Sequence, residues 1–395
     1  MLMDLNEQFR RARLTGALEV VCEQLELTAT QYEEAKTRYD GVSRWLAGSS
    51  HPALAGVSIY VQGSTAIGTT VKPIGRNEHD VDLIARLQAA ARGYPPALVK
   101  KMIGDRLKEH GVYDRLLEEM CRCWRLDYAN EFHLDITPSI PNPACANDGE
   151  LVPDRELRDW KPSNPRGYKA AFERRAELRP RMRLRKSLQF DERAAASIEP
   201  YPEAGGFKGV LRRSVQIAKR HRDVHFERRP GECAPISVIV TTLLAWSYEH
   251  CVARMEFEDE LDVLTAAIAG MTNFVEHRDG QWFIWNDTTP GENFAEKWNS
   301  HPDRAASFFA WHRKLVNDIA VLRSVEGLDG IARQLNEALG ERPAEIAVAH
   351  LEKSVSAPRA AGALRYGATG LAASAPALVA PRASAAVPRN TFFGT

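Results

Sequence analysis

Three aspartates in two short segments have the residue type and spacing for chemistry on phosphates. Asp80 and Asp82 lie two residues apart in a segment where polar and apolar residues alternate. Residues two apart in a strand point to the same face of a sheet, so both carboxylates face the same way. Asp135 lies in a similar segment, residues 131–136, with His133 on its side of the strand. The sequence therefore predicts that carboxylates converge on one face of a sheet.

Converging carboxylates repel one another unless a cation lies between them. Mg²⁺ binds through one or two carboxylates and phosphate oxygens, and pairs of such ions serve in-line phosphoryl transfer. A Gly-Ser turn at Gly63-Ser64 follows the β-rich residues 57–61, and Ser64 stands sixteen residues before Asp80. Either motif alone also fits a solvated strand or an ordinary turn. Their combination with a separate strand aspartate predicts a divalent-metal site for phosphoryl transfer.

The elements that position these residues are predicted to be a small sheet between helices. The three segments that carry the Gly-Ser turn and the aspartates have the composition of strands. Residues 4–47, 95–120 and most of 209–351 have the apolar spacing of helices. We expect a helical N-terminal brace (1–55), a catalytic core (56–205), a C-terminal helical domain (206–353) and a flexible Ala/Pro/Arg-rich tail (354–395).

The composition is that of an ordinary globular protein. The chain has 395 residues, of which 44% are hydrophobic and 26% charged, and 52 Lys and Arg balance 52 Asp and Glu. No overall field therefore draws it to nucleic acid or membrane. With no signal-like apolar run and no CxxC pair among six cysteines, we expect a reduced cytoplasmic protein. Cys121, Cys123 and Cys145 do not make a four-ligand zinc set.

Several linked motifs resemble those of one bacterial family. They are residues 62–73 (Gln-Gly-Ser-Thr-Ala-Ile-Gly-Thr-Thr-Val-Lys-Pro), Asp80-Val-Asp82, residues 133–138 (His-Leu-Asp-Ile-Thr-Pro), and residues 164–168, 219–223, 235–237 and 292–298. Over roughly residues 55–300 the chain is similar to the cGAS/DncV-like nucleotidyltransferases (CD-NTases), the cyclic oligonucleotide synthases of CBASS anti-phage systems. The resemblance implies an α/β (α+β) fold with a polymerase-beta-like nucleotidyltransferase core. A small mixed sheet, an N-terminal brace helix and a C-terminal helical domain complete it.

The resemblance also implies roles for the catalytic residues. Asp80 and Asp82 would hold two Mg²⁺ ions, for which Mn²⁺ could substitute. Asp135 would complete the metal site and help to deprotonate the attacking ribose hydroxyl, which is a general-base role.

Nucleotide-binding residues follow from the same resemblance. Gln62, Gly63 and Ser64 would close on the triphosphate, as Gly-rich turns do. Lys219 would reach the β- and γ-phosphates, and Ser237 would contact them from the next helix. Lys219 has an alternative reading as one more solvated charge, and Ser237 as a hydroxyl that caps a helix N-terminus.

The implied function is template-independent synthesis of a cyclic di- or trinucleotide from ATP, GTP or other NTPs, with release of pyrophosphate. A terminal nucleotidyltransferase acting on RNA or protein, a nucleotide-adding toxin or antitoxin, and a catalytically silent nucleotide-binding scaffold stay open as alternatives. Implied partners are a downstream cyclic-nucleotide-sensing effector and a ubiquitin-transfer-like enzyme that acts on the tail ending at residues 390–395. Neither membrane binding nor activation by DNA is expected.

Two further groups of residues are predicted to be structural. The basic residues 166–186 are expected to form a solvated helix that adds general electrostatic steering. Trp282, Trp285, Trp298 and Trp311 are expected to pack mostly in the core of the helical domain.

Overall fold

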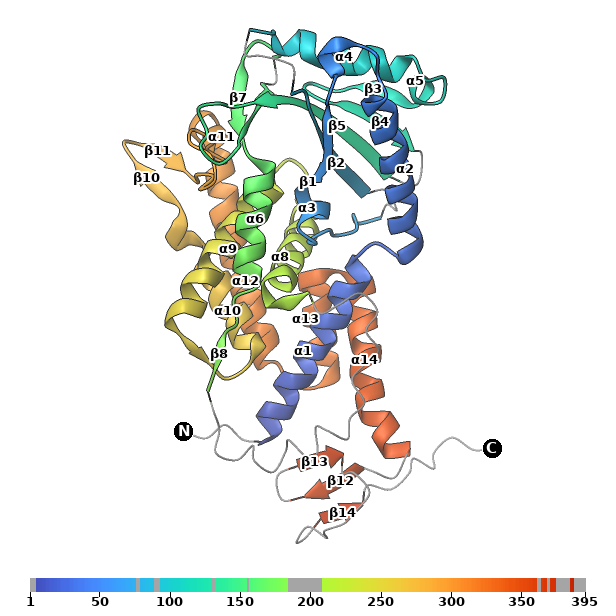
Figure 1. Cartoon of the computed structure of the whole chain (residues 1–395). Coiled ribbons are helices and arrows are strands. Elements are labelled where there is room, and N and C mark those ends of the chain that lie inside the picture. The colour runs from blue at the N-terminus through green and yellow to red at the C-terminus, as the bar shows by residue number, and fades with distance from the viewer. Residues whose placement is uncertain are drawn as a thin grey trace.

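The computed structural model has a sheet-based lobe and a helical lobe (Figure 1). It describes residues 5–75, 79–88, 93–128, 132–154, 156–183, 208–360, 364–367, 370–373 and 384–386. The end of the predicted basic helix, residues 184–186, and the tail motif at residues 390–395 lie outside the described residues.

The sheet is mixed, as the sequence predicts. Its main path runs β1-β2-β5-β4-β3, and β6 and β7 extend it from β5. The pairing of β2 with β5 is parallel, and the other pairings are antiparallel. The strands are β1 (Ser58–Gln62), β2 (His79–Arg86), β3 (Leu117–Glu119), β4 (Trp124–Tyr128), β5 (Phe132–Pro141), β6 (Glu150–Pro153) and β7 (Trp160–Ser163).

One face of this sheet is buried and the other carries the polar residues. Alternate residues of β4 and of the first part of β5 are buried, which is the period-2 pattern of a half-covered strand. Helices α2 (Ala29–Ala47) and α4 (Pro96–Lys108) complete the core of this lobe, together with strand residues such as Leu83, Leu134 and Ile136. The side chains between the buried ones, including the aspartates, therefore face away from this core.

The helical lobe has a core of its own, with Trp311, Phe308 and Leu243 at its centre. Its main helices are α1 (Leu5–Leu25), α6 (Pro165–Ala176), α8 (Gly209–Glu227), α9 (Ser237–Arg254), α10 (Glu260–Ala269), α12 (Pro302–Ser324), α13 (Leu328–Leu339) and α14 (Glu341–Ala360). Shorter elements are α3 (Gly63–Ala66), α5 (Tyr113–Leu116), α11 (Glu296–Ser300), 3-10 helices at Pro52–Leu54 and Met271–Phe274, and strands β8 (Arg181–Met182), β9 (Glu256–Phe257), β10 (Glu276–Arg278), β11 (Gln281–Phe283), β12 (Leu364–Gly367), β13 (Gly370–Ala373) and β14 (Ser384–Ala386).

The N-terminal segment predicted as helical over residues 4–47 is two helices that belong to different lobes. A capping box at Thr28 starts α2 and separates it from α1. The Thr28 side chain accepts a hydrogen bond from the Gln31 backbone N–H, and the Gln31 side chain accepts one from the Thr28 backbone N–H. Helix α1 packs beside α14, whereas α2 packs on the sheet lobe (Figure 1). Helix α14 itself continues to Ala360, into the segment that the sequence assigns to the tail.

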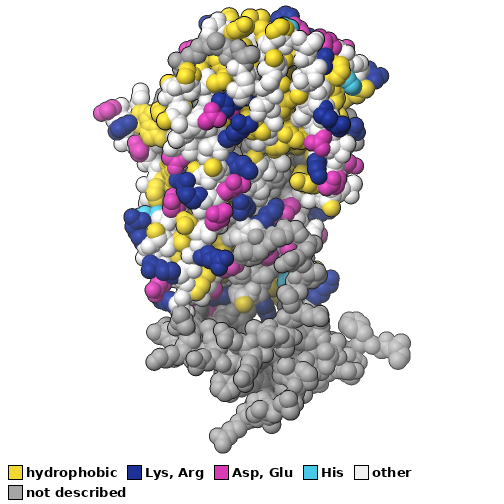
Figure 2. All heavy atoms as spheres, viewed as in Figure 1, with side chains coloured by type: hydrophobic (Ala, Val, Ile, Leu, Met, Phe, Trp, Pro, Cys, Tyr) yellow, Lys and Arg dark blue, Asp and Glu magenta, His cyan; other side chains and the backbone are white. Residues whose placement is uncertain are grey.

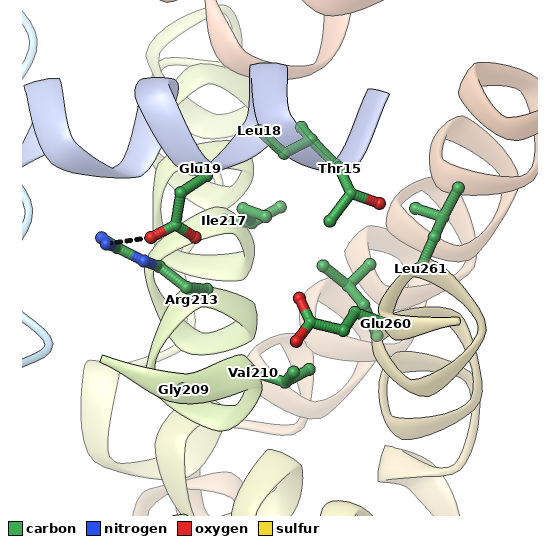
Figure 3. Close-up of a pocket in the computed structure, with 10 residues that line it drawn as sticks. Thr15, Leu18, Glu19, Gly209, Val210, Arg213, Ile217, Glu260 and Leu261 are labelled. Carbon is green, nitrogen blue, oxygen red and sulfur yellow. Dashed lines mark hydrogen bonds and ion pairs between the residues drawn. The ribbon is translucent and has the colours of Figure 1, made fainter. Parts of the chain in front are cut away.

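One face of the protein is mixed in charge (Figure 2), and a small cavity lies inside the helical lobe. Basic and acidic side chains are interspersed over the face drawn in Figure 2, as expected for balanced charge. No helix in the described part of the chain is long and apolar enough to span a bilayer. Figure 3 shows a cavity of about 30 Å³ between α1, α8 and α10, where Glu19 pairs with Arg213. It has room for about one water molecule and fits no nucleotide.

Candidate active site between the two lobes

A cleft of about 1200 Å³ lies between the sheet edge and the helical lobe. Its sheet-side wall comes from β1, β2 and the turn after β1, and its other wall from α8, α9 and the loop before α11. Seven of the eight predicted site residues line it: Gln62, Gly63, Ser64, Asp80, Asp82, Lys219 and Ser237. The cleft is large enough for two nucleotides.

Strand register brings the predicted carboxylates into one row. Gln62 pairs with Asp82 across β1 and β2, and Asp82 pairs with Asp135 across β2 and β5. Arg125 of β4 stands opposite Asp135, and Glu118 of β3 is in register beyond it. Paired residues of neighbouring strands point to the same face, so these side chains lie side by side.

Asp82 is the buried carboxylate of this row. Burial and the charges of Asp135 and Asp80 together raise its pKa to about 6, although Arg125 and Lys219 lower it in part. Its negative charge is therefore incompletely neutralised by the protein. A cation bound beside this carboxylate would stabilise its ionised form.

Asp135 points to the same face of the sheet as Asp82 and is held there by an ion pair. Its Oδ1 accepts a hydrogen bond from Arg125 Nε at 2.7 Å, and its Oδ2 accepts one from Arg125 Nη2 at 2.8 Å. The Arg125 Nη2 atom also lies 3.7 Å from Asp80 Oδ1. The Asp80 side chain is 63% exposed and faces the cleft.

Gly63 is at a turn position whose backbone conformation and surroundings favour glycine. Its φ is +65°, and a Cβ built there would lie 2.5 Å from Asp82 Oδ2. The turn therefore lies against the carboxylate, so a phosphate held at the turn would also be close to Asp82.

Comparisons with known proteins agree with this arrangement. Residues 13–175 match the model of the Second Messenger Oligonucleotide or Dinucleotide Synthetase domain. A Roseivirga ehrenbergii protein named c-di-GMP synthase is 29% identical over 389 residues, which covers 97% of this chain and 98% of that protein. Cyclic dinucleotide synthase CdnG of Bradyrhizobium diazoefficiens is 23% identical over 334 residues, covering 80% of this chain and 78% of CdnG.

Solved structures share the fold. That of the Bradyrhizobium diazoefficiens CD-NTase CdnG with GTP has a TM-score of 0.64 at 22% identity and covers 85% of this chain and 98% of that one. That of Escherichia coli CdnC with ATP has a TM-score of 0.60 at 13% identity and covers 82% and 97%. The chain resembles these cyclic dinucleotide synthases in sequence and shares the CD-NTase fold. The nucleotidyltransferase architecture predicted from the sequence is thereby confirmed.

Lys219 reaches the cleft wall from α8 but is almost fully buried. Its Nζ donates hydrogen bonds to the Thr69 backbone oxygen at 3.2 Å and to Thr69 Oγ1 at 3.0 Å. Burial and the charge of Arg222 together lower its pKa to about 7, although the charges of Asp223 and Asp82 raise it in part. Lys219 is therefore neither a solvated charge nor a freely extended one, since it ties α8 to the Gly/Ser/Thr-rich segment.

Several residues that line the cleft lie outside the predicted set of site residues. Arg222 lines the cleft and donates from Nη1 to Ser237 Oγ at 2.9 Å. Trp285 lines the cleft too, whereas Trp298 and Trp311 are buried in the helical core as expected. Arg222 lies within the family-like residues 219–223, so the sequence contained a signal for it.

Glu292 contributes a carboxylate to the helical-lobe wall. Its Oε2 accepts a hydrogen bond from Asn286 Nδ2 at 2.7 Å, and its Oε1 accepts one from Ser163 Oγ at 3.2 Å. Burial raises its pKa. The two contacts hold the carboxylate in a fixed direction within the cleft and leave acceptor capacity on both oxygens.

The predicted metal ligands differ from the arrangement expected. Within the described residues, no three His, Cys, Asp or Glu side chains are grouped so that they could hold a metal by themselves. Of the three aspartates, Asp80 and Asp82 line the cleft, whereas Arg125 engages both oxygens of Asp135. Two carboxylates still suit Mg²⁺, which completes its shell with phosphate oxygens and water. The incompletely neutralised charge of Asp82 also favours a bound cation.

Proposed function

We propose that this protein makes cyclic di-GMP from two molecules of GTP. The observation that carries the proposal is the row of Asp82 and Asp135 beside the Gly63 turn, at one wall of a cleft of about 1200 Å³, which is large enough for two nucleotides. The relatives named c-di-GMP synthase and CdnG support a cyclic dinucleotide product, and the GTP complex of CdnG supports guanine nucleotides.

Asp80 and Asp82 would hold Mg²⁺ or Mn²⁺, two ions in the reaction-ready state, and the ions would neutralise the triphosphate and the charge that develops on it. The protein's own residues do the rest. The Gly63-Ser64 turn holds phosphate oxygens beside Asp82. On the opposite wall, Lys219 and Ser237 contribute a cation and a hydroxyl. Catalysis then depends on positioning and on preorganised charge.

The reaction is a displacement at phosphorus. The ribose hydroxyl oxygen of one GTP forms a bond to the α-phosphorus of the other, and the bond between that phosphorus and the bridging oxygen to the β-phosphate breaks. Pyrophosphate leaves, and the hydroxyl proton passes to the Asp135 carboxylate. The linear product repeats the step within the same cleft, so that two pyrophosphates leave for each ring.

Glu292 supports guanine over adenine. A guanine presents N1–H and N2–H donors on one edge, which a carboxylate accepts as a pair, whereas adenine presents the acceptor N1 there. Sites built to satisfy a hydrogen-bonding edge reject bases that leave the polar group unpaired. The fixed carboxylate of Glu292 is such a site.

The cell-level proposal follows from the family. The product would act as a second messenger in anti-phage defence, read by a cyclic-nucleotide-sensing effector in the cytoplasm. A ubiquitin-transfer-like enzyme acting on residues 390–395 is a further proposed partner.

Incubation of the purified protein with four radiolabelled NTPs and Mg²⁺ or Mn²⁺, followed by phosphatase, tests this function. We expect one phosphatase-resistant product that needs GTP alone and is lost in Asp80→Ala and Asp82→Ala. Only phosphatase-sensitive chains would indicate a terminal transferase. Absence of any product, with GTP still bound, would indicate a silent nucleotide-binding scaffold.

A further inference from the structure

Arg125 is the cationic neighbour of Asp135 in this row of side chains, and it lies outside the residues predicted from the sequence. It comes from β4, opposite Asp135 in the antiparallel register. Its guanidinium bonds both oxygens of Asp135 and approaches Asp80. Of the described Lys and Arg side chains, it is the one that forms ion pairs with these aspartates.

We propose that Arg125 is a positioning residue with two effects, an inference that rests on the proposed nucleotidyl transfer. It fixes the carboxylate of Asp135 for the attacking hydroxyl. It also weakens the affinity of the empty site for a free divalent metal, so that metal enters together with the phosphates of the nucleotide.

The positioning effect follows from the shape of the contact. A guanidinium and a carboxylate joined by two parallel hydrogen bonds have a defined mutual orientation, which a single ammonium contact does not impose. Both contacts here are short, and Arg125 is only 22% exposed. Asp135 is thus held level with Asp82, and both of its oxygens accept hydrogen bonds from Arg125.

The effect on metal affinity follows from charge. Three carboxylates attract a divalent ion strongly, and a guanidinium among them cancels part of that attraction. A bound nucleotide would restore the attraction of the site for a divalent ion, because its phosphates would add negative charge at the Gly63 turn beside Asp82. In the free protein, Arg125 takes the place of part of the counter-charge that a metal would provide.

A purely structural Arg125 would behave differently. If it only reinforced the pairing of β4 with β5, its loss would lower stability without raising metal affinity. Metal affinity without nucleotide therefore separates the two roles.

The test is Mn²⁺ binding to the full chain without nucleotide, measured by the free-Mn²⁺ electron paramagnetic resonance signal. Arg125→Gln removes the positive charge, and Arg125→Lys keeps the charge but cannot donate two parallel hydrogen bonds to the carboxylate. Arg158→Gln is the control, because it removes a positive charge from an 80% exposed side chain of the same lobe. We expect Arg125→Gln to bind Mn²⁺ about tenfold more tightly. Arg125→Lys and Arg158→Gln should match the parent.

Turnover with GTP supplies the second readout. We expect kcat to fall in both Arg125 variants with KM for GTP little changed, whereas Arg158→Gln keeps the parent values. Unchanged or weaker Mn²⁺ binding by folded Arg125→Gln would overturn the charge effect, and full kcat in Arg125→Lys would overturn the positioning effect. If Arg125→Gln does not fold, Arg125→Lys decides: lower kcat at parent Mn²⁺ affinity supports the proposal, and any other result opposes it. Because Mn²⁺ binding needs no product, failure of the proposed cyclisation in the parent protein is recognised separately.

Discussion

Replacing Asp82 by Asn should make the metal-free protein more stable while it abolishes activity. The folded protein keeps the Asp82 carboxylate buried beside Asp135 and Asp80, and this raises its pKa from 3.8 to about 6. An ionised group with a raised pKa costs the folded state free energy. Asn has nearly the same shape and carries no charge, so the variant avoids that cost.

The size of the stability gain and the pH range over which it develops both follow from the two pKa values of Asp82. A tenfold change in acidity is worth about 1.4 kcal/mol, so the rise of this pKa corresponds to at most about 3 kcal/mol, and we expect a gain of about 1–3 kcal/mol. Between about pH 4 and pH 6 the folded state binds more protons than the unfolded state, so stability of the parent falls as pH rises through that window. The difference should be complete at pH 8 and nearly absent at pH 4.

The assay is urea denaturation of the full chain in EDTA at pH 4 and pH 8, with pulsed hydrogen exchange of the β2 and β5 amides reporting the sheet lobe. Asp135→Asn is the matched control, because it leaves Arg125 without its main partner, and we expect it to lose about 1–2 kcal/mol. Mn²⁺ should stabilise the parent more than Asp82→Asn. A less stable Asp82→Asn at pH 8, or a gain of the same size at both pH values, would refute the reasoning.

Other substitutions give further expected outcomes. Gly63→Ala should lower kcat more than about a hundredfold in steady-state assays, because its Cβ meets Asp82 at a positive φ. Lys219→Met should weaken GTP binding about tenfold by titration calorimetry. Because the pKa of Lys219 is about 7, GTP affinity of the parent should fall as pH rises above 7, and this slope should be missing in the variant. Glu292→Gln should reduce the preference for GTP over ATP by about tenfold or more in competition assays, and an unchanged preference would remove Glu292 from base selection.

The sequence located the strands that carry the aspartates because their alternation is local. It could not show that β2 and β5 pair in parallel with Asp82 level with Asp135, since that register depends on packing between segments far apart in the chain. Arg125 was missed for the same reason, because its relation to Asp135 exists only through the pairing of β4 with β5. The break between α1 and α2 was readable, since Thr28 and Gln31 form a capping-box pattern.

Lys219 illustrates a different limit. Its place on a basic helix suggested a cation directed at phosphates, and the sequence gives no measure of burial. The structure places its ammonium against Thr69, where desolvation changes its protonation as well as its reach. Pairwise contacts of this kind decide how a motif residue works, and they are set by tertiary packing.

The two hydrophobic cores share no residue, although one chain end contributes a helix to each. Each core can therefore melt as its own cooperative unit, with residues 26–28 as the short connection between α1 and α2. Heating without ligand should then give two transitions in calorimetry. A nucleotide seated in the cleft contacts both units and stabilises both by mass action, so saturating GTP should draw the two transitions together. The substrate would then couple the unfolding of two lobes that unfold independently in its absence.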